Sequence, residues 1–142
     1  MLRTRLLHPE ILRALGSAGH GARVMIADGN YPFSTEAPAT ATRVFLNLRR
    51  GLVTVCDVLE VLVETIPIEA AVLMEAPEGF PTPAHDDYRR ILPAATPITL
   101  HKRHDFYLEV KSPATTLLIA TGEERRFANI LLTIGVVKSE YA

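Results

Sequence analysis

Short apolar runs alternate with segments of helical periodicity along this chain of 142 residues, and this alternation constrains its fold more than any other feature. The apolar runs are typical of strands buried in a sheet; they cover residues 23–27, 69–74, 115–121 and 130–137. Two shorter strands are expected over residues 43–48 and 98–100. Helices are expected over residues 8–18, 54–66, 84–92 and 103–111. Such alternation predicts an α/β fold, a layered sandwich whose central, mostly parallel sheet is flanked by helices.

The length and composition predict one compact domain over residues 1–142. Hydrophobic residues make up 48% of the chain and charged residues 22%, a mixture that argues against disorder. A net charge of −1 gives the chain no electrostatic reason to bind nucleic acid or anionic membranes. The one cysteine, Cys56, excludes an internal disulfide. With no secretory signal and no apolar stretch near the roughly 20 residues that cross a bilayer, we expect a cytoplasmic protein.

The most suggestive group for chemistry is Gly19-His20-Gly21, which Asp28 follows within the same segment. The free side chain of histidine has a pKa near neutrality, so His20 can give and take a proton near pH 7. Asp28 is expected at the carboxyl end of a strand, where ligands collect in open α/β sheets. There it could accept hydrogen bonds from sugar hydroxyls or orient the imidazole of His20. The alternative interpretation is a helix end followed by a histidine that pairs with a nearby carboxylate.

A second cluster holds His101, Arg103 and His104 near an expected junction between a strand and a helix. The guanidinium of Arg103 can clamp a hydroxyl, a carboxylate or a phosphate, or it can be a solvated charge at a helix start. Two histidines three positions apart do not fix a third metal ligand, so no metal site is predicted. Asn129 can offer a donor and an acceptor to a polyol, or it can be an ordinary turn residue.

Three separate blocks carry a resemblance to a known family. The first contains Gly19-His20-Gly21 and Asp28-Gly29-Asn30-Tyr31-Pro32, and the second is Arg103-His104-Asp105-Phe106-Tyr107. The third runs over residues 120–136 and contains Thr121-Gly122-Glu123 and Phe127-Ala128-Asn129. In this order they resemble the RbsD/FucU family of D-ribose pyranases and L-fucose mutarotases. The second block is closer to the fucose branch, and the resemblance runs essentially from end to end of the chain.

The resemblance implies an α/β domain that assembles into a homo-oligomer, with a decameric ring as the expected form and active sites at the subunit contacts. It implies interconversion of anomers, or of pyranose and furanose forms, of a free monosaccharide such as L-fucose, with no metal and no organic cofactor. By position, the family's catalytic histidine falls on His20. Its substrate-binding residues fall on Asp28, Arg103, Phe127, Ala128 and Asn129.

These residue types suit the implied chemistry. Opening a cyclic hemiacetal needs one group to take the proton of the anomeric hydroxyl and another to protonate the ring oxygen. Reclosure on the other face reverses both transfers. A neutral histidine such as His20 can serve in either direction, and each well-placed acid or base typically contributes about 10²–10⁴-fold.

Two positions depart from the family pattern and keep other functions open. Ala22 stands where an aspartate usually follows the Gly-His-Gly motif, and Phe127 stands where a tyrosine is usual. The ring of Phe127 can pack against a sugar, but it cannot transfer a proton; Tyr107, Tyr31 or a water would have to replace the hydroxyl. The alternative functions are a non-catalytic sugar-binding partner or regulator of sugar uptake or catabolism, and an isomerase or lyase acting on another small polyol.

Overall fold

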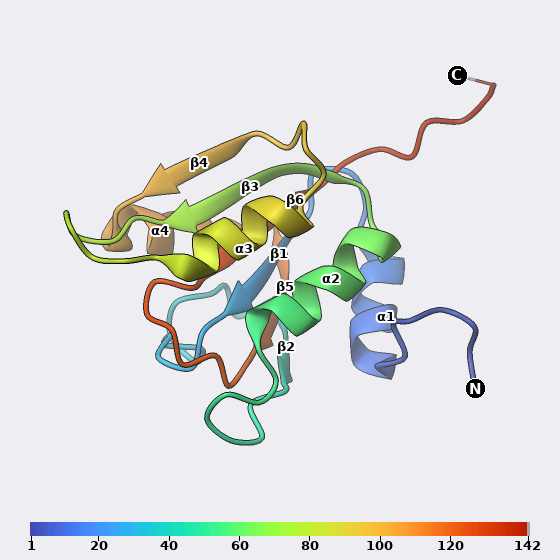
Figure 1. Ribbon diagram of the computed structural model, residues 1–142. Coiled ribbons are helices and arrows are strands. Elements are labelled where there is room, and N and C mark those ends of the chain that lie inside the picture. The colour runs from blue at the N-terminus through green and yellow to red at the C-terminus, as the bar shows by residue number, and fades with distance from the viewer. Residues whose placement is uncertain (142) are drawn as a thin grey trace.

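The computed structural model describes residues 1–141, which form six strands and four helices. In chain order they are α1 (Pro9–Ser17), β1 (Arg23–Ala27), β2 (Thr42–Phe45), α2 (Val55–Thr65), β3 (Ile68–Met74), α3 (Pro83–Ile91), β4 (Ile98–His101), α4 (Arg103–Val110), β5 (Thr115–Ala120) and β6 (Ile130–Ile134). Each predicted helix and strand is present, which confirms the predicted α/β class (Figure 1).

Two strands end earlier than predicted. β2 ends at Phe45, and the chain then turns back on itself, with the Leu48 N–H donating to the carbonyl of Leu46. β6 ends at Ile134, because this residue forms the last pair with β3 and the next N–H, of Gly135, donates to Pro67 outside the sheet. The remaining apolar residues of the predicted strand lie beyond the sheet and are exposed.

The sheet has the order β2-β5-β1-β6-β3-β4. β1, β2 and β5 are mutually parallel, as are β3 and β4, whereas β6 is antiparallel to both of its neighbours, β1 and β3. The last strand in the sequence therefore lies inside the sheet and joins its two parallel parts. The prediction of a mostly parallel sheet flanked by helices is confirmed.

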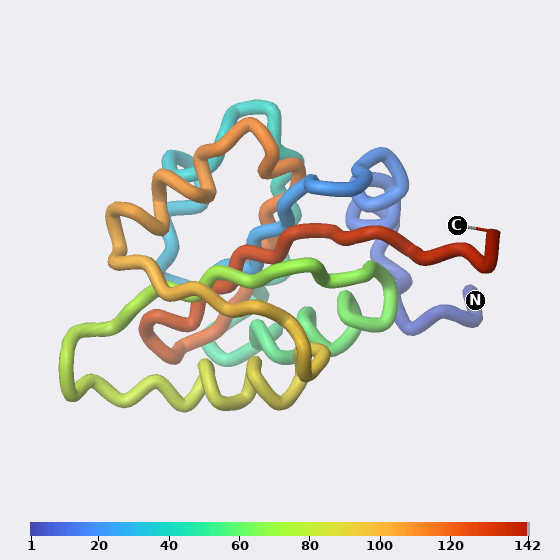
Figure 2. Tube along the Cα trace, turned by 90° about the horizontal axis from the view of Figure 1, so that it is seen from above, coloured from blue at the N-terminus to red at the C-terminus, as the bar shows by residue number. Residues whose placement is uncertain are grey.

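Helices cover both faces of this sheet. α1, α2 and α3 pack on one face, over a core that includes Leu59, Leu73 and Leu117. α4 packs on the other face together with the loop from Gly29 to Ala41, as the two sides of the chain trace in Figure 2 show. The covering loop is held by buried Tyr31 and Ala37.

α2 illustrates how local sequence sets these elements. Thr54 caps the helix, accepting a hydrogen bond from the N–H of Asp57, whose carboxylate accepts one from the Thr54 N–H in return. This capping box satisfies donors that a helix start leaves free. Buried Val58, Leu59 and Leu62 then form one apolar face against the sheet.

The topology decides which residues can meet. β1, β3 and β4 end at the same edge of the sheet, and the antiparallel β6 begins there. Residues that follow the first three strands therefore meet residues that precede the last one. This edge is where open α/β sheets bind ligands.

Candidate functional site

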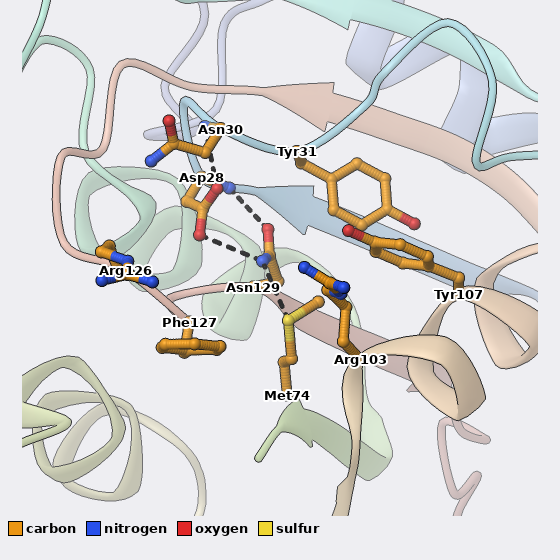
Figure 3. A pocket seen from close by; sticks show the side chains of 9 residues that line it. All are labelled: Asp28, Asn30, Tyr31, Met74, Arg103, Tyr107, Arg126, Phe127 and Asn129. Atoms are coloured by element: carbon orange, nitrogen blue, oxygen red, sulfur yellow. Dashed lines mark hydrogen bonds between the residues drawn. The ribbon is translucent and has the colours of Figure 1, made fainter. Parts of the chain in front are cut away.

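A cavity of about 350 Å³ opens at this edge of the sheet. The residues that line it, drawn in Figure 3, are Asp28, Asn30, Tyr31, Met74, Arg103, Tyr107, Arg126, Phe127 and Asn129. They come from the segment after β1, the end of β3, helix α4 and the loop before β6. Of the predicted substrate-binding residues, Asp28, Arg103, Phe127 and Asn129 line this cavity together.

Asp28 and Asn129 form a reciprocal pair at the back of the cavity. The Asp28 N–H donates to the Asn129 side-chain oxygen at 2.8 Å, and the Asn129 amide nitrogen donates to Asp28 Oδ2 at 3.0 Å. Asp28 Oδ1 also accepts from the Asn30 N–H, and Oδ2 from the Ala128 N–H. Asn129 therefore uses both ends of its amide to fix Asp28, a positioning role that the sequence pattern did not indicate.

Burial controls the charge of Asp28, which is only 2% exposed. Desolvation raises the pKa of this carboxyl above its ordinary value, and the backbone N–H groups of Asn30 and Ala128 act in the opposite direction. Perturbed carboxyl groups in a cavity are typical of functional sites.

The loop before β6 presents Phe127 to the cavity in an unusual backbone conformation. Phe127 has φ of 59°, in the left-handed region that side chains other than glycine rarely adopt. The His85 ring nitrogen Nε2 lies 2.8 Å from the Phe127 carbonyl oxygen, and the Tyr88 hydroxyl donates to the Ala128 carbonyl at 2.7 Å. Two α3 side chains thus hold this turn. Ala128 itself is fully buried and contributes its N–H to Asp28 rather than a surface to the cavity.

Two tyrosines border the cavity, and their hydroxyls differ. The Tyr31 hydroxyl donates to the Glu36 carbonyl at 2.7 Å. The Tyr107 hydroxyl makes no hydrogen bond within residues 1–141 and points toward the interior of the cavity (Figure 3). Desolvation raises the Tyr107 pKa above its ordinary value, so this hydroxyl keeps its proton near pH 7. Of these two, Tyr107 is therefore the one that can replace the hydroxyl absent from Phe127.

His20 does not reach this cavity. It precedes β1, whereas Asp28 follows it, and a strand of five residues separates the two by about 16 Å. The His20 side chain is 58% exposed, and its Nε2 lies 3.0 Å from a carboxylate oxygen of Glu69 on β3. Within one protomer, this pairing matches the alternative interpretation of a histidine beside a carboxylate.

Several lining residues had a weaker sequence signal. Met74 is the last residue of β3, and Asn30 lies two positions after Asp28. Because ligands bind at the carboxyl ends of strands, both could have been predicted as lining residues. Arg126 had no such signal. The sequence has two consecutive arginines here, and nothing in it shows that Arg125 pairs with Glu123 while Arg126 lines the cavity.

Within residues 1–141 no group of three or more His, Cys, Asp or Glu side chains is placed to hold a metal ion. No helix in that part of the chain is long and apolar enough to cross a membrane.

These features define an α/β protein with a small polar site where the strands of a mixed sheet converge. The chain belongs to the RbsD / FucU transport protein family, whose model matches residues 1–137. It is 29% identical to human fucose mutarotase over 145 residues, which cover 93% of this chain and 90% of that protein. It is 31% identical to the D-ribose pyranase of Paracidovorax citrulli over 136 residues, with coverage of 96% and 98%. The crystal structure of the fucose mutarotase from Streptococcus pneumoniae in complex with L-fucose matches with a TM-score of 0.81 and 27% identity, covering 97% of this chain and 100% of that one.

Proposed function

We propose that this protein is a monosaccharide mutarotase that opens and recloses the ring of a free sugar by general acid–base catalysis. The observation that carries the proposal is the convergence of Asp28, Arg103 and Phe127 on one open cavity of about 350 Å³. This volume lies at the small end of the range for ligand sites, which suits a single sugar. The names of the relatives, fucose mutarotase and D-ribose pyranase, support the same reaction class.

In this proposal the lining residues divide the work of binding. Asp28 accepts hydrogen bonds from sugar hydroxyls, and Asn129 holds its carboxylate in place. Arg103 donates to hydroxyls from the opposite wall, and the ring of Phe127 packs against a face of the sugar. Tyr107 provides the hydroxyl that exchanges a proton with the sugar from the α4 side.

His20 acts as the other acid–base group, and we propose that a neighbouring subunit supplies it. The distance along β1 keeps the His20 of a protomer away from its own cavity, whereas its exposure leaves it free to enter another. Exposed apolar side chains support self-association; they include Phe45, Leu48, Leu100 and Leu108. A closed ring, expected to be a decamer, gives every cavity one such neighbour.

Exchange NMR on free sugars at anomeric equilibrium tests the reaction. We expect faster exchange for at least one of L-fucose, D-ribose, D-galactose and L-rhamnose, with L-fucose as the first candidate. His20→Ala should remove most of this acceleration, about 10²–10⁴-fold, while light scattering shows the same oligomer. Spontaneous rates with all sugars, accompanied by binding, would instead support a non-catalytic sugar-binding protein.

Mixing two inactive variants tests the shared site. His20→Ala and Asp28→Asn are each expected to be inactive. When the two are unfolded together and reassembled, about a quarter of the sites should combine an intact His20 from one subunit with an intact Asp28 from its neighbour. Recovery toward a quarter of wild-type activity supports the shared site. No recovery, in a mixed oligomer verified by mass spectrometry, refutes it.

The cytoplasm is the compartment in which we place this reaction, since a mutarotase acts on free sugars inside the cell that metabolises them. Fractionation of cells with an antibody to the protein tests this placement.

A further inference from the structure

Two arginines border the cavity with their N–H groups unused by residues 1–141. Arg103 and Arg126 lie on its wall, and within residues 1–141 neither makes an ion pair or donates a hydrogen bond. The adjacent Arg125 is different: its guanidinium bonds to Glu123 at 2.9 Å and to Asp87 at 2.6 Å. One of two consecutive arginines is therefore used to hold the fold, and the other is presented to the cavity.

Aromatic rings hold Arg126 in place without using its N–H groups. The guanidinium carbon lies 5.0 Å from the centroid of the Phe80 ring and 5.3 Å from that of Phe127. The two rings themselves meet edge to face, with centroids 5.2 Å apart. Stacking on ring faces orients a guanidinium while leaving its donors free for a ligand.

Arg103 borders the same cavity from another wall. It is the first residue of α4, and Figure 3 shows its guanidinium directed into the space between Tyr107 and Asn129. The two cationic groups thus approach one ligand-sized volume from different elements. The adjoining cavity of about 630 Å³ shares both arginines, and Lys102, Glu75 and Glu78 also line it.

The nearby acidic groups do not neutralise this pair of charges. Asp28 is the one carboxylate among the lining residues, and it already accepts three hydrogen bonds from the protein. Glu75 and Glu78 line the adjoining cavity, but neither comes within 4.0 Å of the guanidinium nitrogens. Within the cavity of about 350 Å³, two guanidinium groups therefore stand against one carboxylate, and the hydroxyl groups of a neutral sugar would leave one positive charge unbalanced there.

We propose that the preferred substrate is an anionic monosaccharide, namely a free hexuronic acid whose carboxylate lies between Arg126 and Arg103. This inference rests on the proposed mutarotase function and specifies its substrate. Carboxylates pair with guanidinium groups through two parallel N–H···O bonds, an arrangement that hydroxyls cannot match. The carboxylate is attached to C5, and none of its bonds changes when the bond between the ring oxygen and the anomeric carbon opens and recloses, so the proton transfers are those described for a neutral sugar.

Matched pairs of sugars test the preference. D-galacturonate and D-galactose differ by a carboxylate in place of a hydroxymethyl group, as do D-glucuronate and D-glucose. Exchange NMR should give a catalytic efficiency on the order of ten- to hundredfold higher for the acid of at least one pair. This advantage should shrink as salt is raised, because exposed charges are screened. Equal or higher efficiency for the neutral sugars in both pairs overturns the inference.

Two variants assign the preference to the site. Arg126→Gln should reduce the ratio of acid to neutral efficiency by about tenfold or more. Arg13→Gln removes the same charge from the exposed face of α1 and should leave the ratio unchanged. An unchanged ratio in Arg126→Gln also overturns the inference. A stronger preference for D-galactose 6-phosphate than for D-galacturonate would overturn the assignment to a carboxylate.

A binding measurement separates this inference from the proposed function. Saturation-transfer difference NMR reports binding of D-galacturonate whether or not the sugar is turned over. If no sugar is accelerated, the proposed mutarotase function is wrong, and preferential binding of the acid would then support an anionic-sugar site alone. If neutral sugars are accelerated and the acids neither bind nor react, the function stands and the inference is wrong.

Discussion

His20 and Asp28 lie at opposite ends of β1, one before its first residue and the other directly after its last. The strand places Asp28 in the cavity and holds His20 at the far edge of the sheet, where it pairs with Glu69. Two residues of one motif in the sequence therefore belong to two different surfaces of the folded protomer. In the proposed shared site, the two surfaces meet at one sugar through contact between subunits.

The clamp between Asn129 and Asp28 should contribute to stability as well as to binding. Asn129→Ala removes the amide N–H that donates to the buried Asp28 carboxylate. It also removes the amide oxygen that accepts from the Asp28 backbone N–H. We expect a loss of about 1–3 kcal/mol in the free energy of unfolding, measured by urea denaturation. Asn47→Ala, at an exposed position, is the matched control and should change stability by less than about 0.5 kcal/mol. Equal effects of the two substitutions would contradict the structural role of the clamp.

The hydroxyl of Tyr107 should matter for turnover and that of Tyr31 should not. Tyr107→Phe removes the group that points into the cavity, so we expect kcat to fall by about 10²-fold in exchange NMR. Tyr31→Phe loses a hydrogen bond to the Glu36 carbonyl and should cost about 0.5–1.5 kcal/mol of stability with kcat retained. Phe127→Tyr in the Tyr107→Phe background should restore part of the activity. Full activity in Tyr107→Phe would show that another group transfers the proton.

His85 should make the folded protein sensitive to mild acid. Burial lowers its pKa below the ordinary value of 6.5, although the Phe127 carbonyl opposes this shift. The unfolded chain then binds the proton more tightly than the folded chain, so the free energy of unfolding falls as pH drops below about 6.5. His85→Gln keeps a donor for the carbonyl and should lose less stability between pH 7.5 and 5.5. All other titratable groups are common to the two proteins, so identical pH dependence would contradict this assignment.

Gly122 should tolerate no side chain. A Cβ atom at this position would lie 2.6 Å from the Leu52 carbonyl oxygen and closer still to that of Arg49. Because these are backbone atoms, Gly122→Ala should cost about 2 kcal/mol or more in the free energy of unfolding. Gly16→Ala is the control: it lies in α1 with open space around it and should stabilise the protein by about 0.5–1 kcal/mol. Thermal or urea unfolding of the two variants measures the contrast.

The sequence was sufficient to predict the elements of the fold because their signals are local. Continuous apolar runs mark the buried strands, and the spacing of Val58, Leu59 and Leu62 marks the face of α2. The order of the strands has no local signal. The apolar run at Ile130–Ile134 looks the same whether the strand is parallel at an edge or antiparallel between β1 and β3.

The candidate site was predictable where motifs carry it and hidden where only topology does. Asp28, Arg103, Phe127 and Asn129 follow from the resemblance, and the structure brings them together. Asn129 can hold Asp28 because β6 runs antiparallel to β1, so that the start of β6 lies beside the end of β1. The different environments of Arg125 and Arg126 depend on a turn with positive φ at Phe127, which residue types alone do not specify.

The position of β6 also bears on how the sheet is held together. β6 pairs with β1 on one side and with β3 on the other, so without it the parallel ribbons β2-β5-β1 and β3-β4 would share no strand pairing. Asn129 directly precedes this strand, so one segment both joins the two ribbons and completes the Asp28 clamp. A chain cut before residue 129 would therefore lose the continuity of the sheet and the clamp together.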